Sequence, residues 1–143
     1  MTTSQSPARA VPAQGRAEAA RPLRLFLGLD AVVTGANGLI YLFAAGPVGD
    51  LLGIDTGFLR GIGAFLTLYG TLVAVLASRP VPSTAATKAV IEANLLWAAA
   101  SVAAVVFGWL ETDTAGTVWT PLQAAVVAAF AALQMNALRR LGN

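Results

Sequence analysis

Residues 23–45 read LRLFLGLDAVVTGANGLIYLFAA, an apolar run long enough to cross a membrane as a helix. A transmembrane helix needs about 20 apolar residues to cross a hydrocarbon core of about 30 Å. Three more runs of this kind follow, near residues 58–77, 89–110 and 118–138. All are continuously apolar and rich in Ala and Leu, whereas the strands of a membrane β-barrel alternate in polarity. The sequence therefore predicts an all-α, polytopic membrane protein with four transmembrane helices.

The composition agrees with this class and excludes several kinds of site. The chain is 57% hydrophobic and 11% charged, whereas about a quarter of the residues in soluble domains are charged. It has no cysteine and no histidine. Disulfides, iron–sulfur clusters, thiolate zinc sites, bis-histidine haem and a Ser–His catalytic pair are thereby excluded. No other motif of this kind stands out, so we expect no catalytic, cofactor-binding or metal-binding residue and no enzyme activity.

The charged residues between the apolar runs predict the orientation of the chain. Arginine and lysine gather before the first run, between the second and third, and after the fourth, namely at Arg9, Arg16, Arg21, Arg24, Arg79, Lys88, Arg139 and Arg140. Carboxylates gather in the other two connections, at Asp50, Asp55, Glu111 and Asp113. Basic loops stay in the cytoplasm. We therefore expect two antiparallel hairpins with both termini cytoplasmic, and we do not take the net charge of +2 as a sign of nucleic-acid binding.

The segments outside the apolar runs are short. Residues 1–22 contain almost no large apolar side chain, so they cannot bury enough surface to fold and are predicted to be a disordered cytoplasmic tail. The first apolar stretch begins only at Leu23, and its length favours a retained helix over a cleaved signal peptide. The transmembrane domain then covers residues 23–138, and residues 139–143 are a short cytoplasmic C-terminus. The apolar, glycine-rich connection at 46–57 favours an interfacial helix or a re-entrant turn.

A band of polar side chains runs along one face of the first apolar run, at about 100° per residue. Its members are Asp30, Thr34, Asn37 and Tyr41. Asp30 lies about 10 Å below the cytoplasmic boundary, where an ionised carboxylate is normally paired or functional. Desolvation favours the protonated acid, whereas a nearby cation such as Arg79 or Lys88 favours the ionised form. Two interpretations stay open: a structural role within the bundle, or a site that binds a proton or a cation.

The other runs also place polar or small residues on one face. Small residues beside the polar band predict the close approach of another helix, and they are Gly28, Ala31, Gly35 and Gly38. The polar faces of the later runs contain Arg60, Thr67 and Thr71, then Asn94, Trp97 and Ser101, then Gln123 and Gln134. We expect Asn94 to join the polar band of the first run as part of a candidate intramembrane site.

Three charged residues near the ends of the runs are candidates for structural charge pairs. Glu92 lies only about 5 Å deep and follows Lys88 at i,i+4 spacing, within reach of an ion pair. Its side chain can also snorkel to the interface. Arg60 enters at the external end of its run, where the acidic residues of the external connections are its candidate partners. The sequence predicts a structural clamp near the outer surface at this position.

Several short elements carry a family resemblance that covers nearly everything after the tail. They are Leu29-Asp30, Thr34-Gly35, Gly38-Leu39, Leu51-Leu52-Gly53, Leu59-Arg60-Gly61-Ile62-Gly63 and Asn94-Leu95-Leu96-Trp97. In these elements the chain resembles uncharacterised small four-helix integral membrane proteins of actinobacteria. The resemblance implies the fold and a location in the bacterial plasma membrane, and it implies no activity, cofactor or catalytic residue.

Two hypotheses about function remain. The preferred one is a non-enzymatic integral membrane protein that acts through helix contacts, either as an accessory subunit of another membrane protein or as a homo-oligomer. The alternative is a small transporter or proton-coupled carrier that uses a polar stripe centred on Asp30, with Thr34, Asn37 and Asn94 around an internal cavity. In both hypotheses the surrounding partner is the lipid bilayer, no cofactor is bound, and the protein is a multi-pass protein of the plasma membrane.

Overall fold

A computed structural model describes residues 13–142, which form six α-helices and no strand. The helices are α1 (Ala13–Ala19), α2 (Arg21–Phe43), α3 (Ala45–Leu52), α4 (Thr56–Ala77), α5 (Thr84–Val106) and α6 (Thr114–Gly142). Helices α2, α4, α5 and α6 are long and apolar enough to cross a membrane. The prediction of an all-helical chain with four candidate spans is therefore confirmed.

The described segments outside the spans are also largely helical. Of the predicted disordered tail, residues 1–12 lie outside the described residues, while residues 13–19 form α1. This short segment consists mainly of Ala, Gln, Arg and Glu, which are strong helix formers. The connection after α2 contains the short helix α3, which agrees with the helical alternative for this segment. Helix α3 ends at Leu52, and the next residue, Gly53, has a φ of 70°, a left-handed conformation that glycine adopts without strain.

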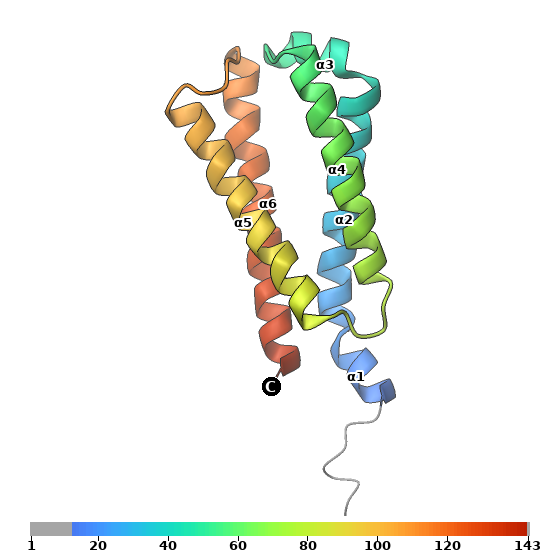
Figure 1. The fold of residues 1–143 in the computed structure, drawn as a ribbon. Helices are drawn as coiled ribbons and strands as arrows, with labels where there is room; N and C mark the ends of the chain where they lie inside the picture. The colour runs from blue at the N-terminus through green and yellow to red at the C-terminus, as the bar shows by residue number, and fades with distance from the viewer. Residues whose placement is uncertain (1–12, 143) are drawn as a thin grey trace, which may run out of the picture.

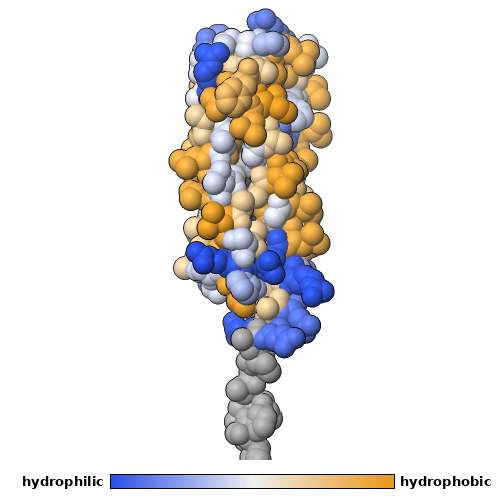
Figure 2. Space-filling model, turned by 90° about the vertical axis from the view of Figure 1, so that its right-hand side faces the viewer, coloured by the Kyte–Doolittle hydropathy of each residue, from blue (hydrophilic) through white to orange (hydrophobic). Residues whose placement is uncertain are grey.

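The four long helices pack as two pairs (Figure 1). Helix α2 packs along α4 and α5 packs along α6, whereas the two pairs meet mainly through α2 and α6. The start of α2 and the end of α6 lie at the same end of the bundle. Figure 2 shows hydrophobic side chains over the middle of the bundle and hydrophilic ones toward its ends. This apolar outer surface is the reverse of a soluble protein's and suits a hydrocarbon environment.

Two clusters of buried apolar side chains lie along the bundle. The tail-side cluster consists of Leu23, Leu27, Ala31, Val73, Leu76, Val90 and Ala137. The α3-side cluster consists of Tyr41, Ala45, Leu52, Ile54, Leu59 and Leu66. On α2 the first cluster ends at Ala31 and the second begins at Tyr41. Thr34 and Asn37 of the polar band lie between them, whereas Asp30 lies beside the first cluster and Tyr41 belongs to the second.

Helices α2 and α4 approach each other closely because glycines face each other at their contact. A Cβ atom added to Gly38 would lie 2.6 Å from the backbone nitrogen of Thr67. A Cβ atom added to Gly63 would lie 2.5 Å from the backbone nitrogen of Leu42. Close backbone packing of this kind stabilises helix pairs in membranes, where apolar side chains gain little by leaving lipid. At Gly38 the small face of α2 therefore receives another helix, as its sequence predicts.

We expect Gly63→Ala to lower the free energy of unfolding by about 1–3 kcal/mol, because the added methyl group forces the α2 and α4 backbones apart. Gly28→Ala is the matched control, since a Cβ atom at Gly28 meets nothing within 4 Å. The measurement is the unfolding of both variants in the same detergent. Equal stability of Gly63→Ala and wild type would contradict the close packing of α2 on α4.

Candidate functional site: a buried polar cluster

A buried polar cluster forms around the carboxylate of Asp30. The Oδ2 atom of Asp30 accepts hydrogen bonds from Asn94 Nδ2 at 2.7 Å and from Gln134 Nε2 at 2.8 Å. The Oδ1 atom accepts one from Thr34 Oγ1 at 2.9 Å. The exposed fraction is 0% for Asp30 and Gln134 and 3% for Asn94. Side chains from α2, α5 and α6 thus converge on one carboxylate.

Tyr69 connects the polar cluster to α4, the one long helix of the described chain that contributes no hydrogen bond to Asp30. Its hydroxyl oxygen lies 3.0 Å from Asn94 Oδ1 and 3.2 Å from the carbonyl oxygen of Val90, and it donates toward both. Asn94 in turn donates to Gln134 Oε1 at 3.3 Å. We use the name polar cluster for Asp30, Thr34, Tyr69, Asn94 and Gln134. The cluster links the α2/α4 pair to the α5/α6 pair with hydrogen bonds.

Every side chain that hydrogen-bonds Asp30 within residues 13–142 is neutral. Arg79 and Lys88, the cations considered from the sequence, are exposed. The Oδ2 atom can accept from two amides whether or not the acid is ionised. The hydroxyl of Thr34 can donate or accept, so Oδ1 can carry a proton and keep this hydrogen bond. The cluster can therefore hold Asp30 in either charge state.

The structure brings three of the predicted site residues together and leaves two apart. Asp30, Thr34 and Asn94 belong to the polar cluster. Asn37 lies one turn further along α2, and its side chain makes no hydrogen bond within the described part of the chain, but it lines the cavity described below. Tyr41 belongs to a separate contact, in which its hydroxyl oxygen accepts a hydrogen bond from Trp119 Nε1 at 2.6 Å.

The charged candidates lie outside the polar cluster. Arg60 is exposed near the start of α4, and Lys88 and Glu92 are exposed on the first three turns of α5. Their exposure means that water or lipid head groups can solvate them. The pairing predicted for these three residues remains a prediction.

Two members of the polar cluster were not assigned to the site from the sequence. Gln134 was placed on the polar face of its helix, but nothing in the sequence connects it with Asp30. The polar faces predicted from the sequence do not include Tyr69, because a tyrosine in an apolar run is typical of packing or of an interfacial belt. Its position next to Gly70 and one turn after Leu66, near the middle of α4, is the signal that could have identified it.

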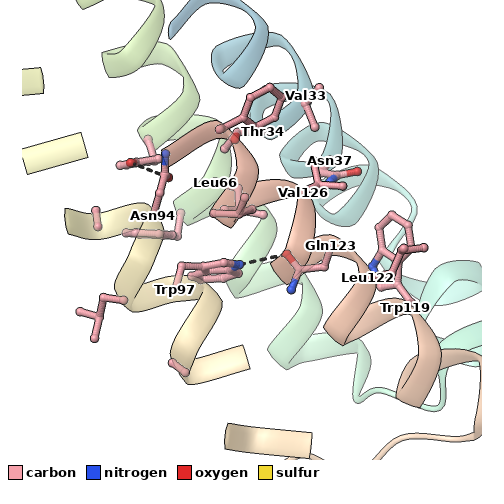
Figure 3. Close-up of a pocket in the computed structure, with 17 residues that line it drawn as sticks. Val33, Thr34, Asn37, Leu66, Asn94, Trp97, Trp119, Leu122, Gln123 and Val126 are labelled. Atoms are coloured by element: carbon pink, nitrogen blue, oxygen red, sulfur yellow. Dashed lines mark hydrogen bonds between the residues drawn. The ribbon is translucent and has the colours of Figure 1, made fainter. Parts of the chain in front are cut away.

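A cavity of about 590 Å³ lies against the polar cluster on the side toward α3 (Figure 3). All four long helices contribute to its wall. Its polar and aromatic lining includes Thr34, Asn37, Tyr69, Asn94, Trp97 and Gln123. On this wall the indole Nε1 of Trp97 donates to Gln123 Oε1 at 3.1 Å, as the dashed line in Figure 3 shows. The cavity therefore touches three members of the polar cluster directly.

Comparisons with protein-family models, curated proteins and solved structures find no match for this chain. The four long apolar helices are compatible with an integral membrane protein. The function of the chain therefore has to be inferred from the residues of the polar cluster and of the cavity.

We expect Gln134→Leu to lower the free energy of unfolding by about 1–2 kcal/mol, because the buried carboxylate of Asp30 loses a donor and Asn94 loses an acceptor. Gln123→Leu is the matched control, since Gln123 is only half-buried and bonds Trp97 rather than a carboxylate. The free energy of unfolding of both variants is measured by reversible denaturation in mixed micelles. A loss for Gln134→Leu no larger than for Gln123→Leu would refute the stabilising role of the polar cluster.

Proposed function

We propose that this chain is a non-enzymatic integral membrane protein that acts through helix contacts, as a homo-oligomer or as an accessory subunit of another membrane protein. In this proposal it crosses a bacterial plasma membrane four times as two antiparallel hairpins, with both termini in the cytoplasm. The distribution of basic residues supports this orientation. Amides and hydroxyls surround Asp30 within the described residues, an arrangement suited to holding helices together rather than to acid–base catalysis.

The outward face of α4 is the observation that carries the proposed mode of action. Small exposed residues recur on this face at Gly57, Gly61, Ala64 and Thr71, with the larger, exposed Leu68 between the last two. A Cβ atom added to Gly61 would meet nothing within 4 Å. The hydroxyl of Thr71 donates to the carbonyl oxygen of Thr67 at 2.7 Å, so it is satisfied within its own helix. A face of small residues allows a second helix to approach closely in a membrane.

A second candidate function, a small transporter or proton-coupled carrier, is favoured by the position of the cavity. Thr34 and Asn94 line the cavity and also hydrogen-bond Asp30. A molecule bound there would be separated from the carboxylate by one side chain. Because Asp30 can take up a proton without losing Thr34 as a partner, the charge of the acid could couple to what occupies the cavity.

The topology can be tested with single cysteines, because the chain has none of its own. Thr84→Cys and Thr114→Cys place thiols at exposed positions where α5 and α6 begin. In intact cells we expect a membrane-impermeant maleimide to label Thr114→Cys and to label Thr84→Cys only after the cells are opened. The reverse pattern, or labelling of both in intact cells, would overturn the proposed orientation.

The mode of action can be tested by native mass spectrometry of protein extracted gently from its own membranes. We expect a stoichiometric second chain, either another copy or a different protein. Gly61→Leu should reduce the bound fraction about tenfold, because the larger side chain blocks the close approach on α4. Ala99→Leu on α5 is the matched control at another exposed position. A wild-type monomer would contradict the proposal, and a monomer carrying a small molecule would favour the carrier.

A further inference from the structure

The cavity opens toward lipid between α4 and α5. Phe65 of α4 and Leu96 of α5 line the cavity, yet they are 53% and 71% exposed. A second cavity of about 470 Å³ continues toward α3 and shares Asn37, Trp97 and Gln123 with the first. Volumes of this size suit small-molecule ligands. A molecule dissolved in the bilayer could therefore enter sideways, without passing through water.

No charged side chain lines the larger cavity. Asp30 is fully buried behind Thr34 and Asn94 and already accepts three hydrogen bonds. An ionised ligand would have to give up its hydration with no opposite charge in contact with it, which is strongly unfavourable inside a membrane. The wall therefore selects an uncharged occupant.

Asn37 gives the occupant a polar partner. Its side chain lines both cavities and makes no hydrogen bond to any residue in the range 13–142. An amide left without a partner in hydrocarbon loses several kcal/mol. Trp97 and Gln123 already satisfy each other. A lipid acyl chain would leave the Asn37 amide unpaired, whereas a carbonyl oxygen would accept from its Nδ2.

Three aromatic rings form a row along the wall of the cavity, from α4 to α5. The ring of Phe65 is stacked on that of Tyr69 at 6.0 Å between centroids and on that of Trp97 at 6.1 Å. Both pairs of ring planes are inclined by only 13°. Offset stacking is favourable between aromatic rings, so a ring at an end of this row can stack a further flat ring.

We propose that the cavity binds an uncharged, membrane-soluble molecule with a flat ring that carries a carbonyl oxygen. The ring lies against the aromatic row of Phe65, Tyr69 and Trp97, and the carbonyl oxygen accepts a hydrogen bond from Asn37. On α4, Phe65 follows Gly61 at i,i+4 spacing and lies near it. Asn37 and Ala100 lie on α2 and α5, so substitutions there test ligand binding separately from chain association at Gly61.

Menadione is a suitable probe, since it is an uncharged flat ring with two carbonyl oxygens and it quenches tryptophan fluorescence. The full chain is studied in lipid nanodiscs with a single tryptophan in each variant. Trp97 reports on the cavity, and a reporter introduced by Leu72→Trp, at a position that is 59% exposed and lines neither cavity, reports on menadione dissolved in lipid. We expect quenching of Trp97 to saturate with menadione concentration and quenching of the Leu72→Trp reporter to rise without saturation.

Two substitutions in the Trp97 reporter test the recognition. Asn37→Leu should raise the half-saturating menadione concentration about tenfold, the equivalent of about 1.4 kcal/mol for one lost hydrogen bond. Its folding should be unaffected, because the Asn37 side chain makes no hydrogen bond within the described chain. Ala100→Phe should abolish saturation by filling the cavity, while Ala99→Phe, which faces away from the cavity lining, should not.

Three outcomes would overturn the proposal. Unsaturable quenching of Trp97, like that of the Leu72→Trp reporter, would mean that the cavity holds only lipid chains. Saturation with an unchanged half-saturating concentration in Asn37→Leu would refute recognition of a carbonyl oxygen by the amide. Equal effects of Ala100→Phe and Ala99→Phe would place the binding site elsewhere. If Ala100→Phe fails to fold, the half-saturating menadione concentration of Asn37→Leu, compared with that of the Trp97 reporter without this substitution, still tests the proposal.

Discussion

The carboxylate of Asp30 constrains the arrangement of all four long helices. A carboxylate buried in an apolar bundle must receive hydrogen bonds, because lipid offers none. Its donors come from Thr34 on its own helix, Asn94 on α5 and Gln134 on α6. These bonds fix how far the α5/α6 pair stands from the α2/α4 pair at the depth of Asp30. Tyr69 then connects α4 to the same group of side chains through Asn94.

The two levels of packing use different physics. Within the α2/α4 pair, glycines such as Gly38 and Gly63 let the two backbones approach until no Cβ atom would fit. Between the pairs, the hydrogen bonds of the polar cluster add to the apolar contacts of the tail-side cluster, and α4 and α5 have little direct contact. Lipid competes well for apolar side chains but poorly for hydrogen-bonding groups. The pairs can therefore be held together at the polar cluster and still leave a cavity beside it.

The sequence predicted the spans well because a long apolar run in lipid has few alternatives to a helix. Helical periodicity also placed Asp30 and Thr34 on one face. It could not identify Gln134 or Tyr69 as members of the cluster, because that depends on how α6 and α4 are rotated relative to α2. Helix ends were less accurate for another reason: α5 begins at Thr84 because the side chain of Ser83 accepts a hydrogen bond from the backbone of Ala86, and hydropathy does not detect caps.

Asp30 and Asn37 lie two turns apart on α2, yet their surroundings differ. Those of Asp30 indicate a structural role, and those of Asn37 indicate a binding role. The carboxylate of Asp30 is completely enclosed, and three side chains satisfy it. The amide of Asn37 is half-buried, faces a cavity and has no side-chain or backbone partner within the described residues. A group that only stabilised the bundle would be expected to have its partner inside the bundle. The partner of Asn37 is therefore to be sought among molecules that enter the cavity from the membrane.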